Sequence, residues 1–345
     1  MTHGINLLFK ISIKLIRYMK IIVVGCGSIG RRHIKNLKKL SVDNILVFDK
    51  EREQALKVQK ECDVEILDTF EDAVKEKADA ALVCTPNHTH IPIATKMVQG
   101  GKHVFIEKPL SNTLVGVHHL LREAKKRNLI TMVGCNLRFH EASKKLKELL
   151  EGNIIGKIYG ARMEFGNYLP NWEHPQKDYR KRYSAKASMG GGIIMDAIHD
   201  IDYACWLFGF PKKGFCFYGK FSNLEIDTED FAEILLKFEN KIVEIHLDYL
   251  QRERIREYVL IGEKGNIEID FNEIRVKIAF QNGIKSSVFK FSGDKNQMYL
   301  DEMRHFIECI KHGREPENSV EEAIKVLEIA LKAKESSNKG KVFEL

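Results

Sequence analysis

Short apolar runs alternate with amphipathic, charged stretches along the first 135 positions of the chain. The runs are rich in β-branched residues and are predicted to be buried strands, and the stretches between them are predicted to be helices. Predicted strands cover 20–24, 45–48, 64–67, 80–84 and 104–107, and predicted helices cover 31–40, 51–61, 69–77 and the segment ending at Gln99. This alternation is typical of an α/β domain with a parallel sheet and crossover helices.

The second half of the chain has a different pattern, in which strands come first and helices follow. Several runs alternate with period two and are separated by turn residues, which predicts strands. These runs cover 214–221, 231–238, 242–249, 258–262, 266–271 and 274–280, and predicted helices cover 298–311 and 320–334. With 345 residues, 44% of them hydrophobic, the chain can bury two cores. We expect a first domain over 19–138 and a second over 139–345.

The first predicted strand runs directly into a glycine-rich turn and a helix, the context of a dinucleotide-binding Rossmann fold. The turn is Gly25-Cys26-Gly27-Ser28-Ile29-Gly30. Gly25 permits the tight turn, Gly27 permits approach of a pyrophosphate, and Gly30 permits close packing of helix and strand. Asp49 ends the second strand, 24 residues after Gly25, where an acid binds the ribose hydroxyls of NAD. Lys50 and Arg52 leave NADP open.

Lys108 follows the strand that ends at Glu107 and precedes Pro109. The alternative interpretation is a strand end with a surface lysine and a turn. However, Gly25, Asp49, Thr85 and Lys108 all fall at strand carboxyl ends, where parallel sheets bind their ligands. This coincidence places Lys108 beside the cofactor.

A second candidate segment starts at three consecutive glycines, Gly190 to Gly192, and predicts a helix of about 15 residues that ends at Gly209. Asp196 and His199 would then lie on one face, at i and i+3. The alternative is a structural histidine with capping acids. No metal is expected, because one histidine and nearby acids on one turn lack a third ligand.

Aromatic and arginine residues gather just before that segment, in what is predicted to be a long loop. Aromatic faces suit sugar rings, and arginine suits a carboxylate or phosphate. Each residue alone could be an ordinary surface residue, but the group suggests that the substrate is an anionic sugar or nucleotide sugar. The candidate substrate-binding residues are Trp172, Tyr179, Arg180 and Tyr183, together with Arg138.

Charge and cysteine content argue against several classes of partner and setting. A net charge of +7 is mild, and lysines alternate with acids along predicted helices, so neither nucleic acid nor membrane is an expected partner. Seven scattered cysteines suggest reduced thiols and a cytoplasmic setting. Residues 1–18 are apolar and basic by turns, but the runs are too short to span a bilayer. We expect a disordered extension or a misassigned start there.

The motifs occur in the order seen in the Gfo/Idh/MocA family, which the chain resembles from about Met19 to its C-terminus. Their sequences are Gly25 to Gly30, Cys84-Thr85-Pro86-Asn87-His88-Thr89-His90, Glu107-Lys108-Pro109 and Gly134-Cys135-Asn136-Leu137-Arg138-Phe139. Members are mostly NAD(P)-dependent oxidoreductases of sugars and cyclitols. The resemblance implies that Lys108 touches the reacting oxygen. It also implies a second, α+β domain with an open, mostly antiparallel sheet whose outer face makes dimers or tetramers.

The same resemblance assigns the remaining site residues. The cofactor-binding set is Gly25, Gly27, Ser28, Ile29, Gly30, Asp49, Thr85, Pro86, His88, Glu107, Lys108 and Asn136. The catalytic set is Lys108, His199 and Asp196, although Asp196 and His199 stand three apart where the common family form has four. This departure puts Asp196 in more doubt than His199.

These residues predict hydride transfer between nicotinamide and a secondary alcohol of a sugar, cyclitol or nucleotide sugar. His199 is suited to be the base near neutral pH, Lys108 to steady the alkoxide, and Asp196 to orient His199 or the substrate. Which of the three is the base stays open. The alternatives are redox-neutral, NAD-dependent sugar chemistry of the glycosidase kind and a non-catalytic, cofactor-bound sensor.

Overall fold

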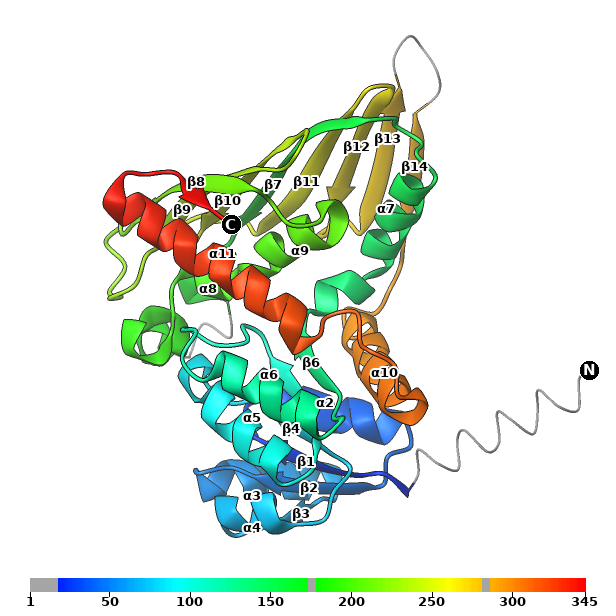
Figure 1. Ribbon diagram of the computed structural model, residues 1–345, viewed down its shortest axis with the longest axis vertical. Coiled ribbons are helices and arrows are strands. Elements are labelled where there is room, and N and C mark those ends of the chain that lie inside the picture. The colour runs from blue at the N-terminus through cyan, green and yellow to red at the C-terminus, as the bar shows by residue number, and fades with distance from the viewer. Residues whose placement is uncertain (1–17, 173–177, 281–285) are drawn as a thin grey trace, which may run out of the picture. The chain divides into compact units, whose positions relative to one another are not determined.

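The computed structural model describes residues 18–172, 178–280 and 286–345, which form two compact units (Figure 1). Unit 1 contains the described residues up to Cys135 together with Tyr299–Ile324. Unit 2 contains Asn136–Met298 and Lys325–Leu345. Of the predicted extension 1–18, all but Tyr18 lies outside the described residues.

This division differs from the predicted boundaries in two respects, because the first unit ends at Cys135 instead of residue 138 and residues 299–324 return to it. The Phe306 ring packs edge-on against Phe105 at 5.6 Å, and the Asn318 side-chain amide donates to the Val133 carbonyl at 2.9 Å. These contacts join residues more than 180 positions apart, so local sequence patterns do not reveal them.

Unit 1 is a six-stranded parallel sheet in the order β3-β2-β1-β4-β5-β6, which confirms the predicted Rossmann fold. The strands are β1 (Lys20–Val24), β2 (Asn44–Phe48), β3 (Glu65–Ile66), β4 (Ala80–Val83), β5 (His103–Glu107) and β6 (Thr131–Gly134). The helices are α2 (Ser28–Lys39), α3 (Arg52–Cys62), α4 (Phe70–Lys75), α5 (His90–Gln99) and α6 (Val117–Lys126), with most of α10 (Gln297–His312).

The strand register brings the predicted cofactor segments to one edge of this sheet. Val24 lies opposite both Phe48 and Val83, and Val83 lies opposite Ile106. Because the strands are parallel, the residues that follow each of them emerge together. β1, β4 and the middle of β5 are almost wholly buried, which fixes these ends on a rigid core.

Unit 2 is a nine-stranded sheet in the order β14-β13-β12-β11-β7-β10-β9-β8-β15. Its strands are β7 (Ile158–Gly166), β8 (Lys213–Gly219), β9 (Phe231–Lys237), β10 (Ile242–Asp248), β11 (Ile255–Gly262), β12 (Gly265–Asp270), β13 (Arg275–Phe280), β14 (Ser287–Lys290) and β15 (Phe343–Glu344). Apart from β10 with β7, the pairs described are antiparallel. The predicted open, mostly antiparallel sheet is confirmed, but its central strand β7 was not predicted.

Helices cover one face of this sheet. The helices of unit 2 are α7 (Glu141–Glu151), α8 (Ile193–Asp196), α9 (Ile198–Phe208) and most of α11 (Val320–Lys339). Of these, α7 contacts β12 and β13, whereas α8 and α9 contact β10 (Figure 1). The predicted single helix after the glycines is wrong, because it breaks at Ala197 into α8 and α9. Asp196 and His199 therefore do not share the face of one continuous helix.

Along β9 and β10, buried positions alternate with more open ones, and the more open side carries a cluster of His246, Glu233 and Asp248. His246 lies 2.6 Å from Glu233 Oε1 and 3.0 Å from Asp248 Oδ2. The bonds to Asp248 and then Glu233 raise the pKa of His246 to about 9, against the opposing effect of burial. The nearby apolar residues Phe217, Leu235 and Ile242 are exposed by 66%, 48% and 53%.

We expect His246→Gln to lower the melting temperature at pH 6 more than at pH 10. Because the folded pKa lies above the unfolded value, the stabilisation is complete below about pH 6.5 and is lost as pH rises through about 9. After allowance for solvent screening, we expect about 1 kcal/mol at pH 6. Thermal melts of both proteins across this range measure it, with the exposed His312→Gln as control. An equal loss at both pH values would contradict the ion-pair explanation.

Candidate active site

The glycine-rich turn has the shape that a diphosphate requires. Gly25 has φ of +100°, and a Cβ there would lie 2.5 Å from the Cys84 carbonyl oxygen. A Cβ on Gly30 would overlap the Gly25 carbonyl oxygen, so both positions need glycine for the fold itself. A Cβ on Gly27 would instead meet open space. Gly27 is also the N-cap of α2, so no side chain caps the first N–H groups of this helix, the kind of helix N-terminus that binds anions.

Asp49 is held at this turn by two backbone bonds. Its Oδ2 accepts from the Cys26 N–H at 2.7 Å and its Oδ1 from the Glu51 N–H at 2.9 Å. The carboxylate is therefore oriented before any ribose binds, with lone pairs left for hydroxyl donors. Arg52, which had left NADP open, pairs with Asp68 at 2.5 Å.

The loop after β4 holds the predicted residues Thr85, Pro86 and His88. It continues as a 3-10 turn over Asn87–Thr89, where His88 is exposed. The Thr89 hydroxyl lies 2.8 Å from Thr85 Oγ1 and 2.7 Å from the Pro86 carbonyl oxygen. These bonds fix the loop beside the glycine-rich turn, because β1 and β4 are adjacent strands.

Lys108 lies at the end of β5, half-buried, and its peptide bond to Pro109 is cis. Two buried histidines that the sequence did not single out hold the residues on either side of it. His33 Nε2 lies 2.5 Å from Glu107 Oε1, and His90 Nδ1 lies 2.8 Å from the Pro109 carbonyl oxygen. Lys108 thus stands at the same sheet edge as the turn, Asp49 and Thr85, as predicted from the strand ends.

In unit 2, Asp196 ends the short helix α8 and is 4% exposed. Tyr249 donates to its Oδ2 at 2.6 Å, and the Tyr183 hydroxyl is also bonded to it. Burial and then the Asp196 charge raise the pKa of both tyrosines well above the usual range, so both remain donors. The predicted residues Asp196 and Tyr183 are therefore brought together, with Tyr249 as a partner that sequence reasoning missed.

The start of α8 is fixed by Glu229, which sequence reasoning also missed. Its Oε1 accepts from the Ile194 N–H at 3.3 Å and pairs with Lys334 at 2.7 Å. Gly192 has φ of +110°, and a Cβ there would collide with the Glu229 carboxyl group. The glycines thus let a buried carboxylate reach the helix N-terminus that carries Asp196.

His199 is the second residue of α9 and is 9% exposed. The acid after it, Asp200, is structural, because it accepts from the Tyr258 hydroxyl at 2.5 Å and the Arg256 guanidinium at 3.1 Å. His199 lies in unit 2 and Lys108 in unit 1, so their joint action stays a prediction.

The predicted substrate-binding residues have varied surroundings. Arg138 makes a bidentate pair with Asp202, at 2.6 and 2.9 Å, with both side chains 4% exposed. Arg180 pairs with Asp178 and Glu225, and the Tyr179 hydroxyl accepts from the Glu225 N–H. Trp172 packs edge-on against Tyr249 at 5.2 Å, which places it near Asp196. Asn136, predicted to bind cofactor, is buried and donates to Met298 Sδ at 3.1 Å.

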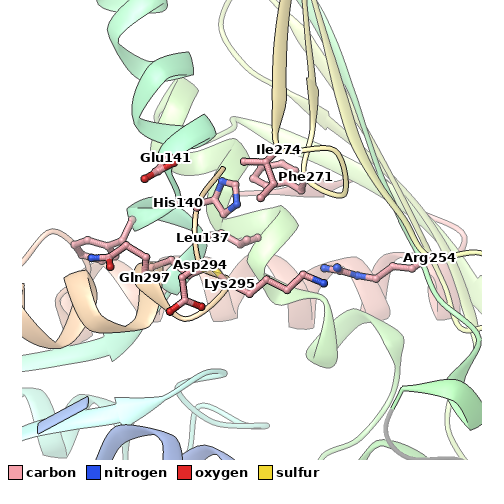
Figure 2. A pocket seen from close by; sticks show the side chains of 12 residues that line it. Leu137, His140, Glu141, Arg254, Phe271, Ile274, Asp294, Lys295 and Gln297 are labelled. Carbon is pink, nitrogen blue, oxygen red and sulfur yellow. The ribbon is translucent and has the colours of Figure 1, made fainter. Parts of the chain in front are cut away.

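A cavity of about 90 Å³ lies within unit 2, beside the turn that carries Arg138 (Figure 2). Its apolar wall consists of Leu137, Phe139, Phe271, Ile274 and Met298. Arg254 and Lys295 also line the cavity, and their side chains point toward one another in this view. Burial, Arg254 and Lys144 lower the pKa of His140 to about 4, so this histidine lines the cavity in its neutral form. The described residues that line this cavity include none of the predicted site residues.

Two family models match the chain, one ending just after β6 and the other beginning within α7. One, described as an oxidoreductase family with an NAD-binding Rossmann fold, matches residues 19–135. The other, the C-terminal alpha/beta domain of the same family, matches residues 147–345. The chain belongs to the Gfo/Idh/MocA oxidoreductase family. The predicted family and its NAD-binding domain are thereby confirmed.

Relatives of this family member extend over the whole chain. Myo-inositol 2-dehydrogenase of Thermotoga maritima is 30% identical over 347 residues, covering 95% of this chain and 98% of that one. Scyllo-inositol 2-dehydrogenase (NAD(+)) of Bacillus subtilis is 27% identical, covering 94% and 95%. A levoglucosan dehydrogenase structure in complex with NADH and L-sorbose has a TM-score of 0.85 at 18% identity, covering 94% and 98%, which supports the fold alone.

No helix in the described ranges is long and apolar enough to cross a membrane. Among the same residues, no group of three histidine, cysteine, aspartate or glutamate side chains could hold a metal ion.

Proposed function

We propose that this Gfo/Idh/MocA oxidoreductase is an NAD-dependent dehydrogenase that oxidises a secondary alcohol of a sugar or cyclitol. The observation that carries the proposal is the gathering of the glycine-rich turn, Asp49, the Thr85 loop and Lys108 at one carboxyl edge of a parallel sheet. A lysine at the carboxyl edge of a parallel sheet is placed where such sheets bind their ligands.

The orientation of the Asp49 carboxylate and the pairing of the nearby Arg52 favour NAD over NADP. A carboxylate held by two backbone N–H groups accepts from ribose hydroxyls and repels a 2′-phosphate. The nearby Arg52 is paired with Asp68, so its charge is not directed at a 2′-phosphate and does not offset the repulsion by Asp49.

Each catalytic residue has one chemical task in this proposal. His199 removes the hydroxyl proton, Lys108 stabilises the developing alkoxide, and Asp196 orients His199 or a substrate hydroxyl. Bound NAD supplies the hydride acceptor. The tyrosine bonds to Asp196 hold its carboxylate in one orientation, which supports an orienting role rather than a role as base.

The substrate we propose is a neutral polyol ring rather than an anion. The expectation of an anionic sugar came from arginines near the catalytic segment. Arg138 and Arg180 are both already paired with carboxylates, which weakens that expectation. Trp172 packs against Tyr249, which in turn donates to Asp196, and its indole ring is the candidate surface for a sugar ring to stack on. The cyclitol substrates named for the two inositol dehydrogenase relatives agree with this choice.

The setting and assembly of the enzyme are also proposals. The exposed Phe217, Leu235 and Ile242 on the outer sheet face support a homodimer or homotetramer formed through that face. Burial raises the pKa of the thiols of Cys26 and Cys216 to about 12, which suits reduced core cysteines in the cytoplasm.

A substrate panel tests the proposed function. We expect NADH formation, followed at 340 nm, with a neutral cyclitol or sugar, and weaker or no activity with uronic acids and nucleotide sugars. A redox-neutral enzyme would convert substrate without net NADH, and a sensor would bind NADH and turn over nothing. Faster turnover of an anionic sugar would contradict the proposed substrate class but leave the dehydrogenase assignment in place.

A further inference from the structure

Lys108 can act on a substrate oxygen only if the backbone that carries it is fixed. Both residues next to it are held by buried histidines from two different helices. We propose that His33 and His90 form a clamp that positions Lys108 and couples it to the cofactor loops. They are positioning residues, and this proposal rests on the proposed function, because it concerns the same lysine.

His33 holds the residue before Lys108. It lies in α2, the helix that starts at the glycine-rich turn, and its side chain is fully buried. Its Nε2 lies 2.5 Å from the carboxylate of Glu107, whose side chain is only 12% exposed. The Phe105 ring, edge-on at 5.2 Å, fixes the imidazole plane. A carboxylate buried to this extent needs such a partner, so without His33 the end of β5 would shift to find another donor.

His90 holds the residue after Lys108. It is fully buried at the start of α5, and both ring nitrogens face carbonyl oxygens. Nδ1 lies 2.8 Å from the Pro109 oxygen and Nε2 lies 2.7 Å from the Thr85 oxygen. A carbonyl oxygen only accepts, and burial lowers the pKa of His90, so its neutral ring donates its single N–H to one of these oxygens at a time while lying between both. His90 therefore ties the peptide after Lys108 to the loop after β4.

The two histidines fix Lys108 from both sides and join it to different parts of the predicted cofactor site. His33 connects it to the helix of the glycine-rich turn, and His90 connects it to the Thr85 loop. A shift of about 1 Å in a catalytic group can cost on the order of 100-fold in rate. Losing the contact on either side of Lys108, to Glu107 or to Pro109, should therefore lower kcat more than it weakens NADH binding.

Amide substitutions separate the two bonds of His90. An asparagine amide replaces the Nδ1–H, and a glutamine amide replaces the Nε2–H. We expect His90→Asn to keep the Pro109 bond and with it kcat, while KM for NAD rises several-fold because the Thr85 loop loosens. We expect His90→Gln to keep KM for NAD and to lower kcat by about 10-fold to 100-fold. A purely structural role would not produce this opposite split.

His33 is tested with one disruptive and one conservative variant. We expect His33→Leu to lower kcat by about 10-fold to 100-fold, with the NADH dissociation constant, measured by fluorescence, changed less than about 3-fold. His33→Gln, which keeps a donor at the Nε2 position, should recover most of the turnover. If His33→Leu does not fold, the two His90 variants decide the question alone.

The control is His103→Leu, at the opposite end of the same strand, where His103 Nδ1 accepts from the Ile130 N–H. It should lower the melting temperature without changing kcat. The clamp is overturned if the His33 and His90 variants likewise change only stability, or if both His90 variants change kcat and KM together. If Lys108→Ala is inactive while the clamp variants are not, only the clamp fails. If Lys108→Ala is fully active, the proposed function itself fails.

Discussion

Lys108→Ala and His199→Ala are each expected to lower kcat by at least about 1000-fold while NADH still binds within a few-fold of its normal affinity. Removing Lys108 takes away the cation that stabilises the alkoxide, and removing His199 takes away the proton acceptor. The diphosphate and ribose contacts we propose involve the turn and Asp49, which neither change touches. Steady-state turnover with the preferred substrate and NADH fluorescence titration measure the two quantities.

Matched exposed residues provide controls for these two variants. Lys126→Ala and His119→Ala, both on the exposed side of α6, should leave turnover unchanged. Loss of NADH binding in Lys108→Ala would contradict its catalytic role and make it a cofactor ligand. Normal turnover in His199→Ala would move the base to Asp196 or Lys108. We expect Asp196→Asn to lose less activity than either, since its role is to orient.

The first unit was predictable because its information is local. Each strand of the Rossmann sheet is a buried run that ends in a recognisable residue, and the chain returns to the sheet after every helix. Gly25, Asp49 and Lys108 follow from these runs without knowledge of long-range contacts. The helix α10 was predicted, but its place in unit 1 was not, because it belongs there through long-range contacts such as that of Phe306 with Phe105.

The second unit was less predictable, and its misses have physical causes. β7 is the central strand, and Arg162 and Glu164 alternate with buried apolar residues in it, so a local strand signal was present and was overlooked. Its central position was not visible locally, because its neighbours β10 and β11 are far along the chain. At Ala197 the backbone leaves the helical region, with φ of −95° and ψ of 23°, and the apolar periodicity around this residue does not mark the break. The predicted i, i+3 face was lost with it.

Residues that orient the site were missed for a related reason. His33 and Glu107 are 74 positions apart, and Tyr249 and Asp196 are 53 apart. A lone histidine or tyrosine in an apolar pattern is more often a core residue, so its partner becomes visible only in the folded chain. Sequence patterns predict which groups perform the chemistry, whereas the fold was needed to find the residues that contact and orient those groups.

Arg138→Ala is expected to destabilise the protein by about 3–5 kcal/mol, because it leaves the carboxylate of Asp202 buried without its partner. The sequence suggested a substrate contact for Arg138, but its guanidinium faces Asp202 through both Nε and Nη2. Urea unfolding of the two proteins measures the loss in free energy. KM for the substrate, measured below the unfolding transition, should stay within about 2-fold, since an ion pair inside the fold does not select a ligand.

The double variant Arg138→Leu with Asp202→Leu separates an unpaired charge from lost packing. We expect it to recover most of the stability, because replacing both members of a buried ion pair by apolar side chains is often neutral or stabilising. The single change Asp202→Leu should be as damaging as Arg138→Ala, since it leaves a guanidinium buried at 4% exposure. A large rise in KM for Arg138→Ala, with stability unchanged, would contradict this and restore Arg138 to the substrate site. The buried ion pair predicts a large loss of stability with little change in KM, so the two measurements together decide whether this arginine stabilises the fold or binds the substrate.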